Sequence, residues 1–432
     1  MQLCSTLVFV GLLGLPLVAS RTVAAQAPRG PGDVTVDELV ARALADNLEL
    51  QAVRAEVDAA QGRVRQAELR PNPMLDLGVQ DNMTGTDSNI TVSVTLPLDL
   101  GGRKAGRVGV AERTFEMKRA QVLDRARRLR AEVRMKAGEV LAAQRNLQFT
   151  EELLRVNRDA LDLLRARVDR GATPPLEESL LRVEVNRLEA SRQLLASQVQ
   201  VLTLQLKALV GLAPEAALAL LGDLGAAPPP FDLQEGLTRA LATRSDVMVA
   251  QAEVAMAGAM ILKEQAEGRW DASVNVGYMR QRSGFMLNGL TERGEPRPID
   301  DVFHYVGGGV TIMLPVRNRN QGNIAAALAE ASATEHRTAA IRLAIRQEVT
   351  AAFTQYEATH RALEIYTHGV WEVARQNLAV VRQTYELGRA TLLDVIAEQR
   401  RYIDIETGYT EALKQAYDAA VDIERAVGTL EH

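Results

Sequence analysis

The chain contains little cysteine, few aromatic residues and few histidines. Cys4 is the only cysteine, aromatic residues make up 4% of the sequence, and there are 5 histidines. Beyond position 4, disulfides, thiolate metal sites and cysteine nucleophiles are therefore excluded. We expect no resident metal and no cofactor, because the histidines do not pair at the spacing of metal ligands: His304, His336, His360, His368 and His432.

Strong positive charge and catalytic motifs are missing as well. The formal net charge is -5 at pH 7, which argues against nucleic acid as a partner. The sequence shows no phosphate-binding glycine loop and no set of nucleophile, base and oxyanion donors, so we do not expect an enzyme. We also expect no helix apolar enough to cross the inner membrane.

The first residues have the pattern of an export signal. An apolar run covers residues 7–19, and Val23 and Ala25 follow at the positions that a signal peptidase reads. We predict a signal peptide over residues 1–25 and a mature chain that begins at Gln26. A short membrane anchor is the alternative.

The rest of the chain consists of two similar halves. The stretch "RALADNLELQAVRAEV" at 42–57 resembles "RALATRSDVMVAQAEV" at 239–254, and the Pro-rich stretch "GDLGAAPPPF" separates the halves. We therefore predict two repeats that are joined by a linker, with the order 26–221, 222–231 and 232–432.

Long helical patterns dominate both repeats. Helices are predicted at about residues 33–70, 99–170, 174–210, 232–268, 317–387 and 391–427. A helix of about 70 residues is roughly 100 Å long, several times the size of an ordinary domain. In the first long helix an apolar residue occupies every seventh position, which predicts coiled-coil packing: Val133, Val140, Leu147, Leu154, Leu161 and Val168.

Four segments alternate between apolar and polar residues and predict β-strands. The segments "NITVSVTLP", "ASVNVGY" and "HYVGGGVTIML" each have one apolar face, and Leu75, Leu77 and Val79 form a weaker fourth case. Each segment has about 8 to 11 residues, the length of a tilted strand that crosses a bilayer. The stretches "LPLDLGG" and "LPVRNRN" predict the turns from strand into long helix.

A bilayer does not tolerate unpaired strand edges, so four strands per chain must close with other copies. Two copies would give a filled eight-stranded barrel, whereas three give twelve strands and an open lumen. We predict a mainly α fold with a membrane β-barrel: a homotrimer whose 12-stranded barrel is joined at its rim to long α-helices with coiled-coil packing.

These stretches resemble the TolC family of trimeric outer-membrane efflux ducts. The segment from Tyr385 to Gly428, "YELGRATLLDVIAEQRRYIDIETGYTEALKQAYDAAVDIERAVG", is similar to the family's final tip-and-helix pattern. Within the family, "RPNPMLDLGV" and "PLDLGGRKAGR" are more similar to the CzcC-type branch of divalent-cation efflux proteins than to the drug-exporting branch.

The resemblance implies the passive outer-membrane channel of a tripartite efflux system, with heavy-metal cations as cargo. Its barrel would contact outer-membrane lipid, and its helical tunnel would extend into the periplasm. There it would meet a periplasmic adaptor protein and an inner-membrane pump of the resistance-nodulation-division type. A duct for drugs or for type I protein secretion is one alternative. A periplasmic coiled-coil adaptor or scaffold without a pore is another.

Two helix-to-helix turns, "RVDRGATPPLEES" and "YELGRATLLDV", are the expected contact with the adaptor. Glycine permits the tight reversal, and small neighbours let another helical tip approach. The tip residues are Gly171, Ala172, Thr173, Gly388, Arg389, Ala390 and Thr391. Pro174 and Pro175 depart from the family's usual first turn. A plain helical-hairpin turn is the alternative.

Asp394 matches a family position at which carboxylates form a ring at the channel constriction. Glu177 occupies the corresponding place in the first repeat, and Ala397 stands where some members have a second acid. The resemblance implies that Asp394 and Glu177 form a gate that favours cations. Ordinary solvated carboxylates are the alternative.

Basic residues follow the first strand-to-helix junction, at Arg103, Lys104 and Arg107. They could meet lipid phosphate or line the tunnel mouth, or lie on an ordinary solvated face.

Overall fold

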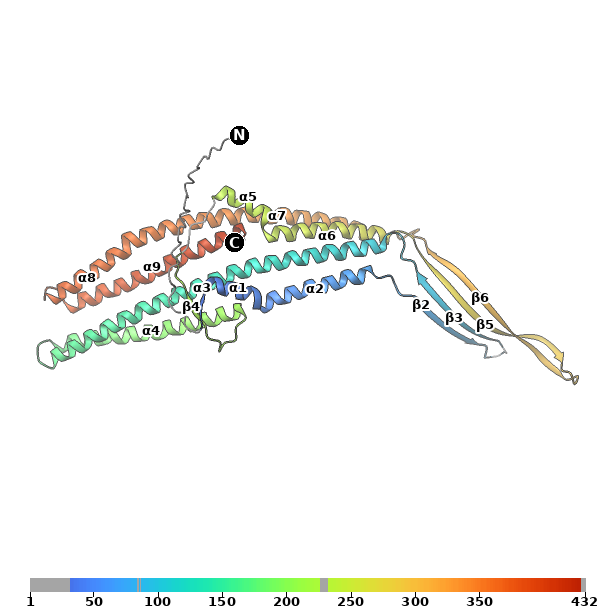
Figure 1. Cartoon of the computed structure of the whole chain (residues 1–432), viewed down its shortest axis with the longest axis horizontal. Coiled ribbons are helices and arrows are strands. Elements are labelled where there is room, and N and C mark those ends of the chain that lie inside the picture. The colour runs from blue at the N-terminus through green and yellow to red at the C-terminus, as the bar shows by residue number, and fades with distance from the viewer. Residues whose placement is uncertain (1–31, 84, 86, 226–231, 429–432) are drawn as a thin grey trace, which may run out of the picture.

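The computed structural model describes residues 32–83, 85, 87–225 and 232–428. The expected signal peptide, His432 and part of the expected linker lie outside these residues. The described chain is elongated, with a long helical body and a β-sheet that projects from one end of it (Figure 1).

Both halves have the same order of elements, in which two helices precede a β-hairpin and a helical hairpin follows it. The first half contains α1 (Val36–Asp46), α2 (Leu48–Glu68), β2 (Met74–Asp81), β3 (Ser88–Pro97), α3 (Arg103–Val168) and α4 (Pro175–Val210). The second contains α5 (Leu233–Thr243), α6 (Ser245–Glu267), β5 (Asp271–Leu290), β6 (Pro296–Met313), α7 (Gln321–Ile365), the π-helix η1 (Tyr366–Trp371), α8 (Glu372–Glu386) and α9 (Leu392–Val427). Short strands β1 (Asp33–Thr35) and β4 (Ala219–Leu221), which the sequence did not predict, pair in parallel.

The helices predicted at 33–70 and 232–268 are each interrupted. Asn47 leaves the helical conformation at ψ 122°, accepts a hydrogen bond from the amide of Leu50 and donates one to the carbonyl of Leu209 (2.9 Å each). Arg244 makes the corresponding break at ψ 135° and donates to the carbonyl of Ala426 (2.8 Å). Both breaks depend on carbonyls that are distant in sequence, so helical periodicity alone does not reveal them.

The stretch Leu233–Glu267 is long and apolar enough, by composition, to cross a membrane. It therefore contradicts the expectation that the chain has no such helix. In the described structure, however, Arg244 interrupts it, and α6 lies in the helical body against α3 and α7.

The predicted seam of α3 is buried at four of its six positions, whereas Leu147 and Val168 are half-buried. Val133 and Val140 are fully buried, and Leu154 and Leu161 are 2% and 5% exposed. The helix has 66 residues and packs against α2, α4, α6 and α9, so it connects the two halves along the whole body.

The sheet has the order β2-β3-β5-β6, and all its pairs are antiparallel. Because β3 pairs with β5, the two halves form one continuous sheet. The strands β5 and β6 have 20 and 18 residues, so the prediction of short strands is wrong for this hairpin. Cross-strand pairing extends it past Gly284 and Asn288, which as sequence are typical of a loop, with a register shift between Phe285 and Asn288.

Both strand-to-helix junctions contact the connection between α6 and β5 at the base of the sheet. The carboxylate of Asp271 accepts from the amide of Leu100, and the amide of the Asn320 side chain donates to the carbonyl of Glu264 (2.9 Å each). The α3 and α7 helices start after Gly102 (φ 87°) and Asn320 (φ 60°), both in the left-handed region.

Two of the three basic residues at this junction form ion pairs within the chain, and their contact with lipid phosphate or the tunnel mouth stays a prediction. Arg103 pairs with Glu267 (2.8 Å), and Arg107 pairs with Asp99 (2.7 Å). Both arginines are therefore neutralised by the chain itself, whereas Lys104 is exposed.

The junction allows a sharp test of packing. A Cβ at Gly268 would overlap the backbone carbonyl of Arg319, whereas a Cβ at Gly322 would meet no described atom within 4 Å. We expect Gly268→Ala to destabilise the chain by about 1–3 kcal/mol. Gly322→Ala should be neutral or stabilise it by about 0.4–1 kcal/mol. Thermal unfolding in detergent, followed by circular dichroism, checks both. Equal midpoints for the two variants would contradict the close approach.

Candidate functional site at the helical tips

The α3–α4 turn and the α8–α9 turn have the same backbone conformation. Gly171 and Gly388 both have φ +71°, and apart from chain neighbours no described atom lies within 4 Å of the position of a Cβ on either. Each turn is closed by a hydrogen bond from the amide after the glycine to a carbonyl five residues earlier: Ala172 to Arg167 (2.9 Å) and Arg389 to Thr384 (3.0 Å). Glycine is therefore required here by the left-handed backbone and not by crowding.

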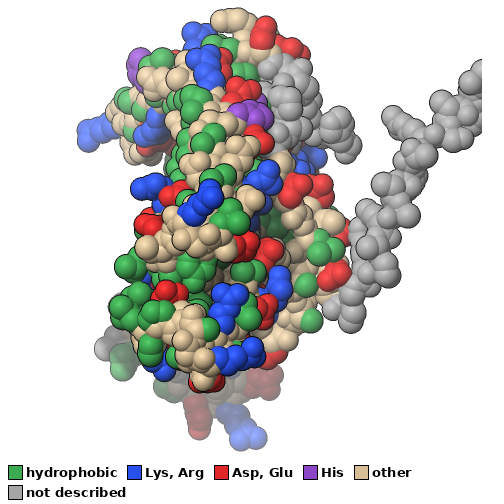
Figure 2. Space-filling view, turned by 90° about the vertical axis from the view of Figure 1, so that its left-hand side faces the viewer, with side chains coloured by type: hydrophobic (Ala, Val, Ile, Leu, Met, Phe, Trp, Pro, Cys, Tyr) green, Lys and Arg blue, Asp and Glu red, His purple; other side chains and the backbone are tan. Residues whose placement is uncertain are grey.

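Both turns lie at the end of the molecule opposite the sheet (Figure 1). Four of the seven tip residues that the sequence predicted line one groove of about 820 Å³: Ala172, Thr173, Gly388 and Ala390. Figure 2 views this end and shows acidic, basic and hydrophobic side chains interspersed, without a large area of one charge.

Asp394 has a structural role that the sequence analysis did not assign. Thr391 precedes α9, and its hydroxyl oxygen accepts from the amide of Asp394 (3.2 Å), while the Asp394 carboxylate accepts from the amide of Thr391 (2.8 Å). This is a capping box, which stabilises the start of α9. The hydrogen bonds from the Thr391 hydroxyl and amide lower the pKa of Asp394 below its ordinary value.

Glu177 stands at the corresponding place in α4 but has a different partner. Pro174 precedes α4 and has no hydroxyl or amide proton for a capping box. The Glu177 carboxylate instead accepts from the hydroxyl of Tyr385 in α8 (3.1 Å). Burial, together with the charge of Glu177, raises the pKa of Tyr385. The hydrogen bond connects the two helical hairpins directly behind their turns.

A second connection lies further from the tip and involves Glu184, which the sequence analysis missed. Its side chain is 1% exposed, and the carboxylate accepts from Arg400 of α9 (2.9 Å) and from Arg187 (2.6 Å). Burial raises the pKa of Glu184, but the hydrogen bonds and charges of the two arginines outweigh it, so the pKa lies below its ordinary value. An acid on the face of α4 that carries Leu181 and Leu188 was the available signal.

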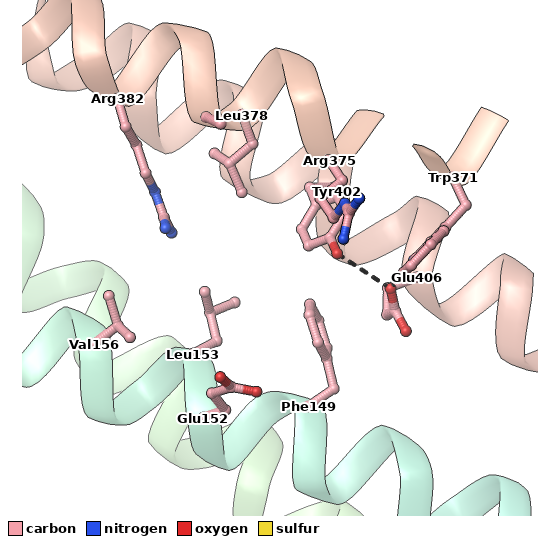
Figure 3. Close-up of a pocket in the computed structure, with 11 residues that line it drawn as sticks. Phe149, Glu152, Leu153, Val156, Trp371, Arg375, Leu378, Arg382, Tyr402 and Glu406 are labelled. Carbon is pink, nitrogen blue, oxygen red and sulfur yellow. Dashed lines mark hydrogen bonds between the residues drawn. The ribbon is translucent and has the colours of Figure 1, made fainter. Parts of the chain in front are cut away.

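A groove of about 420 Å³ between α3 and the α8–α9 hairpin lies behind these connections (Figure 3). On one side of it, Trp371 and Tyr402 donate to the carboxylate of Glu406, which also pairs with Arg145 of α3 (2.9 Å). On the other side, Arg382 extends from α8 toward α3 (Figure 3), and burial lowers its pKa. Trp371 ends η1, and π-helical turns are frequent at functional sites.

The sequence argument against a metal site considered pairs of histidines but not the acids near them. Glu357 and Glu364 stand three and four residues from His360 and were overlooked. In the structure Glu357 pairs with Arg361 (3.3 Å), and the His360 ring stacks on Tyr356. Among the described residues there is no group of three or more histidine, cysteine or acidic side chains placed to hold a metal ion.

Comparison with known proteins gives consistent results. The family model described as "Outer membrane efflux protein" matches residues 39–212 and 236–429. The cobalt-zinc-cadmium resistance protein CzcC of Cupriavidus metallidurans is 26% identical over 397 residues, which cover 92% of this chain and 90% of that protein. The nickel-cobalt-cadmium resistance protein NccC of Alcaligenes xylosoxydans xylosoxydans is 27% identical over 82% of this chain and 76% of that protein.

Solved structures share the fold. CusC, described as undergoing transmembrane channel formation, superposes with a TM-score of 0.71 at 16% identity, covering 93% of this chain and 95% of that one. The open state of the MtrE outer-membrane channel of Neisseria gonorrhoeae has a TM-score of 0.71 at 17% identity, covering 91% and 89%. At these identities the likeness establishes the fold alone.

The buried Glu184 predicts a dependence of stability on pH. Because its pKa is lowered in the folded chain, its contribution is present above the unfolded pKa, about 4.3, and is lost as the pH falls through the folded value. Glu184→Gln should cost roughly 1–2 kcal/mol near pH 7, and wild type and variant should converge as the pH falls below about 4. Glu335→Gln, at an exposed position of α7, is the control. Thermal midpoints across pH measure this, and a constant difference would contradict it.

Proposed function

The chain belongs to the outer membrane efflux protein family, and we propose that it is the outer-membrane duct of a tripartite exporter of heavy-metal cations. The observation that supports a duct is the two-faced sheet on a long helical body. One face has rows such as Leu77, Val92, Tyr278 and Val306, and the other has rows such as Asp76, Ser93, Gly277 and Gly307. An apolar outside and a small, polar inside are what a water-filled barrel requires.

The proposed assembly is a homotrimer. In the described chain β2 and β6 are the edges of a four-stranded sheet. Backbone groups at such edges cannot remain unpaired in a bilayer, so β6 of one copy would pair with β2 of the next. Three copies give a 12-stranded barrel, and the two repeats, 26–221 and 232–432, would each contribute one hairpin per copy.

The cargo is inferred from the relatives. Two proteins whose names state resistance to divalent metals match at least 82% of the chain. The small and polar face of the sheet also carries neutral oxygen-bearing side chains, among them Ser93, Thr95 and Asn275. Such groups tolerate a hydrated cation without binding it tightly, and a passive duct needs rapid release. Nothing in the described geometry favours drugs or secreted proteins as cargo, and a family match in both halves disfavours a scaffold without a pore.

The tips are the proposed contact with the periplasmic adaptor, through which the resistance-nodulation-division pump would deliver its cargo. Four of the seven predicted tip residues line one groove there, and Gly171 and Gly388 give both turns the same shape. The pump would provide the energy.

Asp394 and Glu177 are the proposed gate. Both lie in the first turn of a tip helix, and three copies would bring their carboxylates together around the axis. Glu177 is also held by Tyr385 of the other hairpin, so opening the tip would break that hydrogen bond. Glu177 would thus both contribute negative charge at the constriction and connect the two hairpins.

The tip proposal predicts opposite outcomes for two substitutions. Val does not adopt φ near +71° without strain, whereas Asn tolerates the left-handed region. We expect Gly388→Val to abolish metal resistance in cells while the protein is still exported and assembled, and Gly388→Asn to keep most of it. Growth at graded cation concentrations, with immunoblots of outer membranes, measures this. Full resistance in the double variant Gly171→Val, Gly388→Val would remove the tips from the mechanism.

The gate proposal is tested by removing charge while keeping hydrogen bonds. Asp394→Asn retains an acceptor for the Thr391 amide, and Glu177→Gln retains one for the Tyr385 hydroxyl. The double variant should lose most of the block by trivalent cations in single-channel recordings, because three copies then have no carboxylates at the constriction. Asp169→Asn, at an exposed acid beside the first turn, is the control. An unchanged block in the double variant would mean that the carboxylates only cap and connect helices.

A further inference from the structure

The apolar face of the sheet changes character toward the end that points away from the helical body. Along β5 this face carries Val274, Val276 and Tyr278 and then, with the same alternation, Arg280 and Arg282. Pairing places Arg280 in one row with Val79 and Ile90. Those two side chains are 81% and 40% exposed, so in a membrane they would contact molecules other than this chain.

Aromatic side chains mark the limits of the apolar band. Trp270, which is 50% exposed, precedes β5 at the base of the sheet, and Tyr278 is 38% exposed further along. Eight residues at about 3.3 Å each, tilted by about 40°, span roughly 20 Å, close to the apolar height of an outer-membrane barrel. Arg280 lies two residues beyond Tyr278 and is therefore at the level of the lipid head groups.

Arg280 differs from its neighbours in having no partner among the residues that the structure describes. Arg282 forms an ion pair with Asp300, and His304 is hydrogen-bonded to the hydroxyl of Tyr278 (2.6 Å). Within the described ranges Arg280 makes no ion pair and no side-chain hydrogen bond. Asp81, the other acid on this face, lies one row further out, two strands away from Arg282.

At the opposite rim of the sheet, acids of the chain neutralise two arginines. Arg103 and Arg107 are paired there with Glu267 and Asp99. An unpaired cation beside an apolar band is costly, because the low-dielectric surroundings do not solvate it. At Arg280 the described residues provide no anion, which leaves its charge for an anionic group of the membrane.

We propose that Arg280, with Arg282 and His304 beside it, forms a binding surface for the phosphate groups of lipid A, the phosphorylated glycolipid of the outer leaflet. The assignment rests on the proposed barrel, because it needs the apolar face to point toward lipid. Three features support it: the position of Arg280 just beyond Tyr278, its complementary charge, and its lack of any partner among the described residues. A guanidinium also suits phosphate, because its donors match two phosphate oxygens at once.

The test compares four full-length proteins purified in mild detergent: wild type, Arg280→Gln, Arg280→Lys and Lys104→Gln. Lys104 is an exposed cation at the opposite rim, so Lys104→Gln removes the same charge where no lipid A lies. Binding of purified lipid A, dephosphorylated lipid A and phosphatidylglycerol is titrated by native mass spectrometry with a chelator present. The chelator removes divalent cations that could bridge phosphate to Asp81 or Asp300.

We expect Arg280→Gln to weaken lipid A binding about fivefold. Arg280→Lys should bind between wild type and Arg280→Gln, because an ammonium keeps the charge but not the paired donors, whereas Lys104→Gln should bind within about twofold of wild type. Wild type should bind dephosphorylated lipid A and phosphatidylglycerol more weakly than lipid A. Equal affinity of wild type and Arg280→Gln overturns the proposal, and so does equal binding of the three lipids or a loss of all binding in chelator.

Channel conductance of the same samples in planar bilayers tests the duct separately. Pores without preference for lipid A overturn the lipid surface and leave the duct intact. Lipid A binding that depends on Arg280, in a chain that forms no pore, supports the lipid surface and overturns the duct.

Discussion

The requirement that every backbone group of the sheet be paired determines most of this architecture. The pairing of β3 with β5 joins the two halves into one sheet, which leaves β2 and β6 as its edges. Each hairpin must then return its chain to the helical body at the same level. Both junctions therefore lie against the connection between α6 and β5, where Asp271 accepts from the amide of Leu100 and Asn320 donates to the carbonyl of Glu264. The α6–β5 connection therefore lies beside the starts of both long helices, α3 and α7. As a consequence, α3 packs against elements of both halves.

The tips show how two nearly identical turns acquire different roles. Both glycines have the same φ, and both following helices carry an acid in the first turn. In α9 that acid completes a capping box with Thr391. In α4 a proline takes the capping position, so Glu177 bonds to Tyr385 of the other hairpin. One proline thus converts an acid that stabilises its own helix into one that connects two hairpins.

Arginine is used in two ways along the molecule. Where a charged group is buried between helices, groups of opposite charge surround it, as with Arg244 between Asp246 and Glu348, or Glu184 between Arg187 and Arg400. These groups fix the angles between elements because a buried charge without a partner is costly. Elsewhere the described structure shows no ion pair for the guanidinium, as at the exposed Arg280 on the sheet and the half-buried Arg382 in the groove of Figure 3, so it is available to other molecules.

The sequence by itself determined the long helices, the alternating strands, the turns at Gly171 and Gly388, and the similarity to a family of efflux ducts. These depend on local periodicity and on glycine's freedom at positive φ, which neighbouring residues express directly. It could not show the helix breaks at Asn47 and Arg244, the length of the β5–β6 hairpin, or the partners of Arg103, Arg107, Glu177 and Glu184. Each of these depends on a group far away in the chain: a carbonyl, a pairing strand or an opposite charge. Only the tertiary structure brings such groups within hydrogen-bonding distance, and that distance decides whether a charged residue caps, connects or remains free.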